Sequence, residues 1–120
     1  MVGKQKNKIH SVARATLRDA RISPQKVRLV LDLVRGRQVE PALQILQHSP
    51  KKGSKIVGKL LKSAISNASE HAGADVDKLW ITGAYADMGR VLKRYLPRAQ
   101  GRATKIRKVA SHITLTLGEQ

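Results

Sequence analysis

The sequence contains no cysteine and no phenylalanine, and its 120 residues include only one tryptophan and two tyrosines. Without cysteine, the chain has no disulfide scaffold, no thiolate nucleophile and no cysteine-based zinc site. No apolar run approaches the ~18 residues of a membrane span, and no apolar signal region follows the first residues. These absences predict a cytoplasmic protein with no membrane partner.

Acidic residues are also scarce, because 8 Asp plus Glu stand against 24 Lys plus Arg, and the formal net charge is +16. Residues 1–40 hold 10 basic and 3 acidic residues, and residues 88–120 hold 8 and 1, so each segment carries +7. Between Asp87 and Glu119 no acidic residue occurs. Like charges in such blocks repel each other unless a partner neutralises them, so the sequence predicts binding to a nucleic acid or another polyanion.

The residue pattern offers no catalytic site. Carboxylates are scattered, no nucleophile stands beside a base, and the four histidines share no metal-ligand spacing. We therefore expect no enzymatic activity, no metal and no cofactor. His112, between Ser111 and Ile113, is a candidate donor to a phosphate.

The three aromatic residues decide the expected mode of binding. Trp80 and Tyr85 fall in an expected core strand, so the sequence predicts no sheet platform on which bases stack. Arg and Lys contacts to phosphates should then lead the binding. Tyr95, flanked by Lys93 and Arg94, is a candidate for one base or sugar contact.

The length predicts a single domain over 12–120, preceded by a flexible basic arm over 1–11. Alternation predicts a strand over 13–21 with Arg14 and Arg18 on its polar side. Ser23, Pro24 and Gly36 predict a helix over 24–35. A second helix is expected from Pro41 to 48, and a third of about five turns carries an apolar stripe through 56–68 and ends before Gly73.

Two further strands are expected to pair as a long hairpin over about 79–117. Leu79, Ile81, Gly83 and Tyr85 alternate with the residues between them, and 112–117 repeats the alternation with β-branched residues. Turn chemistry at 97–101 places the tip at about 92–102. Arms of about 16 residues would make a ribbon on the order of 50 Å long. The core of a 120-residue chain is not that wide, so half of the ribbon must project. The expected fold is α+β, a small antiparallel sheet packed against three helices with a long projecting β-hairpin.

DNA is the main alternative to RNA as the nucleic acid. Helices 24–35 and 41–48 have the order of a helix-turn-helix, but the second one carries no Lys or Arg to present in a groove. An architectural DNA protein that inserts the 88–104 ribbon into a minor groove, with Pro97 as a wedge, stays open as an alternative.

Several runs match a known family over about residues 13–117. They include Ser-Pro-Gln-Lys-Val-Arg at 23–28, Leu-Lys-Arg at 92–94, Pro-Arg-Ala-Gln-Gly-Arg-Ala at 97–103 and Ser-His-Ile-Thr at 111–114. In these runs the chain resembles the bacterial form of large-subunit ribosomal protein number twenty-two. One departure is Arg90-Val91, where the family commonly has Pro-Thr.

The resemblance implies a structural constituent of the large ribosomal subunit whose hairpin reaches through ribosomal RNA to the wall of the nascent-peptide exit tunnel. Its implied partners are large-subunit ribosomal RNA, neighbouring ribosomal proteins and the nascent peptide. The tunnel-facing tip would comprise Lys93, Arg94, Tyr95, Leu96, Pro97, Arg98, Ala99 and Gln100. The predicted RNA-binding residues are Arg14, Arg18, Lys26, Arg28, Arg35, Arg37, Lys51, Lys52, Lys55, Lys59, Arg90, Lys93, Arg94, Arg98, Arg102, Lys105, Arg107, Lys108 and His112.

Overall fold

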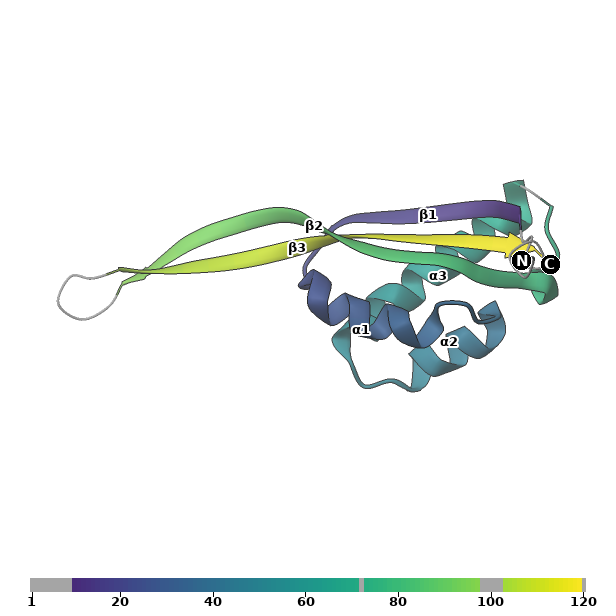
Figure 1. Ribbon diagram of the computed structural model, residues 1–120, viewed down its shortest axis with the longest axis horizontal. Coiled ribbons are helices and arrows are strands. Elements are labelled where there is room, and N and C mark those ends of the chain that lie inside the picture. The colour runs from purple at the N-terminus through teal and green to yellow at the C-terminus, as the bar shows by residue number, and fades with distance from the viewer. Residues whose placement is uncertain (1–9, 72, 98–102, 120) are drawn as a thin grey trace, which may run out of the picture.

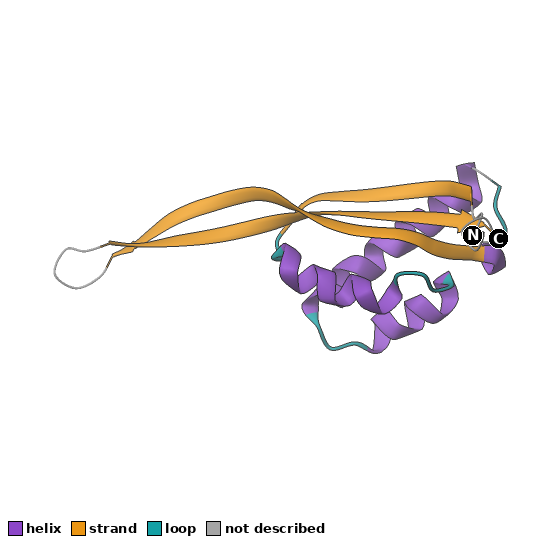
Figure 2. Cartoon of the chain, in the orientation of Figure 1, coloured by secondary structure: helices purple, strands orange, loops and turns teal. Residues whose placement is uncertain are grey.

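A three-stranded antiparallel sheet with helices on one face forms the body of the protein, and two of its strands continue outward as a ribbon (Figures 1 and 2). The computed structural model describes residues 10–71, 73–97 and 103–119. The strands are β1 (His10–Ala20), β2 (Leu79–Pro97) and β3 (Ala103–Glu119), in the order β1-β3-β2. The molecule measures 63 × 33 × 25 Å. The predicted α+β class, the packing of three helices and the projecting hairpin are confirmed.

Helix α1 (Pro24–Val34) forms where local signals place it. The Ser23 side chain accepts a hydrogen bond from the backbone N–H of Lys26 at 3.4 Å, which caps the first turn. Pro24 occupies the first helical position, where its missing N–H costs nothing. Gly36, at φ +78°, adopts the left-handed conformation that lets the chain turn away after the helix.

The other two helices extend beyond their predicted starts. Helix α2 (Val39–His48) begins two residues before Pro41, which fits in the first turn because N–H groups there have no helical partner. Helix α3 (Lys52–His71) has 20 residues and buries Val57, Leu61 and Ala64 along its apolar stripe. A 3-10 turn, η2 (Val76–Lys78), leads into β2. None of the helices in the described ranges has the length and apolar composition that crossing a membrane requires.

The core lies between the sheet and the helices. Ile113, Leu115 and Leu117 of β3 are fully buried, as are Leu79 and Ile81 of β2. Against them pack apolar side chains from all three helices, among them Val27, Val30, Leu31, Val39, Ala42, Leu61 and Ala64. Among residues 10–71, 73–97 and 103–119, no helix lies on the opposite face of the sheet (Figure 2).

The face assignment of β2 departs from the simple alternation. A register shift between Ile81 and Gly83 leaves Thr82 as an extra residue in β2, since Ile81 pairs with Leu117 and Gly83 with Thr116. Beyond this bulge Ala84 and Ala86 face the core, whereas Tyr85 is 56% exposed. The prediction that Tyr85 shares the side of Leu79 and Ile81 is therefore wrong.

The ribbon leaves the body where β1 ends. Ala20 pairs with Ser111, and beyond this point β2 and β3 pair only with each other, from Val91 opposite Val109 to Pro97 opposite Ala103 (Figure 1). Most of the predicted arm, residues 1–9, and the tip residues Arg98, Ala99, Gln100 and Arg102 lie outside the described residues. Strand β1 includes residues 10 and 11, which were expected at the end of the arm.

Candidate nucleic-acid interface

Twelve of the predicted RNA-binding cations have described side chains, and all twelve are exposed. They are Arg14, Arg18, Lys26, Arg28, Arg35, Arg37, Lys51, Lys52, Lys55, Lys59, Arg90 and Lys108. Within the described part of the chain a single ion pair occurs, between Arg35 and Asp32. Most of the described cations are thus available to an external anion.

The ribbon leaves the sheet at residues 18–22, 88–91 and 109–112, and we call these residues the ribbon root. Several of the exposed cations lie in or beside this root. The Lys52 ammonium donates to the carbonyl of Arg21 at 3.2 Å, so the start of α3 lies against the turn between β1 and α1. The backbone N–H of Arg90 donates to Asp19 Oδ1 at 3.3 Å, which brings the start of the ribbon to the same turn. Lys51, Lys55, Arg18 and Arg90 therefore belong to one end of the body.

The Ser-His-Ile-Thr run at 111–114 joins β3 to the turn between β1 and α1 through hydrogen bonds. Ser111 is fully buried, and its hydroxyl donates to the carbonyl of Ile22 at 2.5 Å. His112 Nδ1 accepts the backbone N–H of Asp19 at 3.1 Å, and Asp19 adopts a left-handed φ of 54°. Because a neutral imidazole that accepts at one nitrogen carries its proton on the other, Nε2–H of His112 is the group left to donate. Its donation to a phosphate stays a prediction.

Along the described part of the ribbon, the register sets one pair of cations directly against each other. Lys93 lies directly opposite Arg107, and Lys105 lies opposite Tyr95. Like charges in directly paired positions destabilise a sheet. A polyanion along the ribbon removes that cost, so this register favours binding to a phosphate backbone. The structure does not describe the side chains of Lys93, Arg94, Lys105 and Arg107. Their individual contacts to RNA therefore stay predictions.

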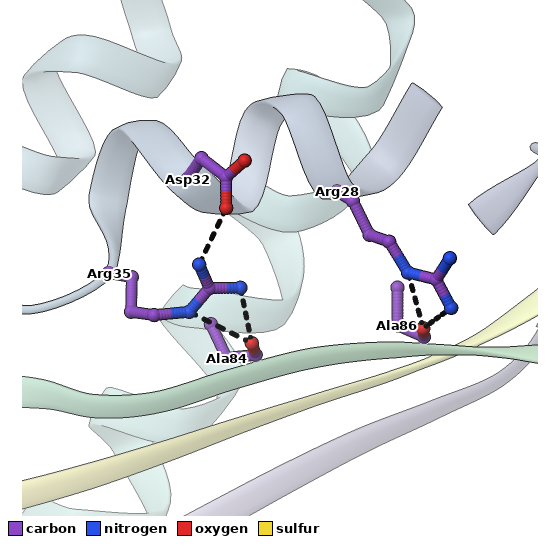
Figure 3. Close-up of polar contacts among 5 residues, drawn as sticks. All are labelled: Arg28, Asp32, Arg35, Ala84 and Ala86. Atoms are coloured by element: carbon purple, nitrogen blue, oxygen red, sulfur yellow. Dashed lines mark hydrogen bonds and ion pairs between the residues drawn. The ribbon is translucent and has the colours of Figure 1, made fainter. Parts of the chain in front are cut away.

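Arg28 and Arg35 have a role that the sequence did not indicate. Nε and Nη2 of Arg28 both donate to the carbonyl of Ala86, at 3.0 and 2.7 Å, and Nε and Nη2 of Arg35 both donate to the carbonyl of Ala84, at 3.2 and 2.8 Å (Figure 3). These carbonyls lie on the edge of the sheet, because β2 pairs with β3 on its other side. An uncovered edge is a site for unwanted strand pairing.

Backbone contacts cover the same edge further along. Gly36 N–H donates to the carbonyl of Ile81 at 3.0 Å, and Ile81 N–H donates to the carbonyl of Arg37 at 2.8 Å. The two arginines continue this protection past the bulge. Arg28 lies in α1, and Arg35 follows the helix as its C-cap residue. Their seven-residue spacing, about two helical turns, places both on one side of the helix, which is compatible with a shared partner but does not identify it.

Replacing Arg35 by alanine should lower the free energy of unfolding by roughly 1–2 kcal/mol, because the Ala84 carbonyl loses two hydrogen bonds from a charged donor in a partly exposed setting. Arg35→Lys should recover little, since an ammonium lacks the planar fork. Urea unfolding measures the effect. Lys59→Ala, at an exposed position of α3, is the matched control with no expected change; equal stability of Arg35→Ala and this control would contradict the edge role.

Residues 15–118 match the family described as ribosomal protein L22p/L17e. The chain is similar to proteins named large ribosomal subunit protein uL22. That of Syntrophotalea carbinolica is 55% identical over 108 residues, covering 90% of this chain and 98% of the relative. That of Caldicellulosiruptor saccharolyticus is 56% identical, covering 90% and 88%, and that of Geobacter metallireducens is 52% identical, covering 90% and 98%.

Proposed function

The chain belongs to the ribosomal protein L22p/L17e family, and from this premise we propose that it binds and compacts large-subunit ribosomal RNA through phosphate contacts, with its hairpin tip lining the nascent-peptide exit tunnel. As a member of this family it is a structural constituent of the large ribosomal subunit and belongs to the ribosome in the cytoplasm. The family is one of structural proteins rather than enzymes. Membership in this family favours RNA as the nucleic acid that the chain binds, over the alternative of an architectural DNA protein.

The observation that carries the RNA-compacting role is the surplus of exposed cations that run from the start of α3 through the ribbon root into the ribbon. Lysine and arginine side chains neutralise phosphates where RNA helices approach each other, which lowers the electrostatic cost of packing them. The opposed Lys93 and Arg107 positions support the same role for the projecting part. The ribbon would then contact RNA from more than one segment.

The tunnel role rests on the family resemblance and on the shape of the hairpin. The paired strands project from the body (Figure 1), and a projecting ribbon suits a tip that reaches the tunnel wall. We assign Lys93 to Gln100 to that wall, beside a neighbouring ribosomal protein.

A site-specific crosslink tests this placement. Because the chain has no cysteine, a photoreactive group on Gln100→Cys labels the tip alone, and Glu70→Cys on the exposed end of α3 is the control. In ribosomes that carry a stalled, radiolabelled nascent chain, we expect the label at 100 to crosslink to the peptide and the label at 70 not to. Association of both variants with large subunits on a sucrose gradient is measured in parallel. Crosslinks from position 100 to RNA alone would contradict the tunnel assignment, and failure of both to co-sediment would contradict the ribosomal role.

A further inference from the structure

The face of the sheet that carries no helix has its own pattern of side chains. Register places Thr16, Thr114 and Tyr85 in one row across the three strands, and Arg14, Thr116 and Gly83 in the next. Arg14, Thr16 and Tyr85 are exposed, and the two threonines of β3 are half-buried. We call these six residues the open face.

The Tyr85 ring is held flat against this face. A Cβ atom added to Gly83 would stand 2.8 Å from the Tyr85 hydroxyl oxygen and 3.1 Å from Cζ, so the ring lies over the backbone of Gly83. The bulge at Thr82 turns Tyr85 outward, and glycine leaves room for its ring. With 56% of the residue exposed, the outer side of the ring faces solvent.

Beside the ring lies a shallow hollow of about 680 Å³, lined by Val12, Ala13, Arg14, Tyr85, Thr114 and Thr116. Its chemistry is mixed, because an aromatic surface stands beside a guanidinium and two hydroxyl groups. Among the described residues the Arg14 guanidinium has no carboxylate within ion-pairing distance. Both Arg14 and Arg18 on β1 are exposed and cationic, so the charge of this face complements an anion.

We propose that the open face is a second RNA contact, on which one unpaired base stacks on Tyr85 while Arg14 binds the adjoining phosphate. This inference rests on the proposed RNA-binding function and adds a base contact to a phosphate-led interface. Every base has a π-face that stacks on an aromatic ring without regard to sequence. The hydroxyls of Thr114 and Thr116 are suited to the 2′-hydroxyl of a ribose, which favours RNA over DNA.

Chemical modification of the wild-type protein tests the contact directly. Tetranitromethane nitrates exposed tyrosines, and mass spectrometry distinguishes Tyr85 from Tyr95. We expect Tyr85 to be nitrated in the free protein and to be protected when the protein is bound to large-subunit ribosomal RNA that carries no other protein. The nitration that remains should then equal the amount contributed by the unbound fraction of the protein. Undiminished nitration in that complex would overturn the proposal. Protection in whole subunits but not in the RNA complex would also overturn it, because a neighbouring protein would then cover the ring.

Variants separate the stacking from the phosphate contact. Tyr85→Ala should weaken affinity for the same RNA about tenfold with an unchanged salt dependence, whereas Tyr85→Phe should stay within about twofold. Arg14→Gln should reduce the salt slope by about one. Leu29→Ala, at a 54% exposed position of α1, is the control. If wild type binds and Tyr85→Ala binds equally well, the open-face proposal fails alone; if wild type shows no salt-dependent binding, the proposed function fails first.

Discussion

Raising the salt concentration from 50 to 200 mM should weaken binding of the protein to large-subunit ribosomal RNA by roughly a thousandfold to a hundred-thousandfold. That range corresponds to about 6–10 phosphate contacts, each of which releases counterions from the RNA. Twelve predicted cations are exposed on the described surface, so this number of contacts is available even before the tip is counted. Filter binding or fluorescence anisotropy across a salt series measures the slope.

A triple variant sharpens this expectation. Lys55, Lys59 and Lys62 lie exposed on α3, and glutamine at all three should lower the slope by up to about three while thermal stability stays the same. An affinity that hardly changes between low and high salt would contradict phosphate-led binding altogether.

The parts of the fold that could be predicted from the sequence depend on local signals. Ser23, Pro24 and Gly36 set the ends of α1 through contacts within a few residues. The hairpin could be predicted because β-branched alternation and turn residues also act locally. The family resemblance then supplied the ribosomal setting, which the family match confirms.

The features that the sequence did not predict depend on contacts between distant segments. The bulge at Thr82 exists only relative to β3, so alternation within β2 put Tyr85 on the wrong face. Arg35 reaches a carbonyl 49 residues away, and no pattern within α1 identifies that acceptor. Charge composition alone assigned Arg28 and Arg35 to RNA, whereas their described contacts stabilise the edge of the sheet. Their binding to RNA, and that of the tip, stays a prediction.

Removing the ribbon should abolish most RNA affinity and leave the body folded. Residues 92–108 are replaced by Asn-Gly, a two-residue hairpin turn, because Val91 and Val109 are already paired opposite each other. The buried residues of the described core lie outside the deleted segment, and β1 pairs with β3 only from Ser111 onward. We therefore expect the free energy of unfolding to change by less than about 1 kcal/mol, as measured by urea denaturation.

The same deletion removes seven of the 24 basic residues, namely Lys93, Arg94, Arg98, Arg102, Lys105, Arg107 and Lys108. Because each phosphate contact contributes about 0.9 to the salt slope, the slope should fall by up to about six and affinity at 100 mM salt by on the order of a thousandfold or more. A full-length variant with glutamine at the same seven positions separates charge from shape. If it binds as weakly as the deletion, charge carries the ribbon's contribution; if it binds like wild type, the ribbon acts through its shape and the electrostatic account of compaction is wrong.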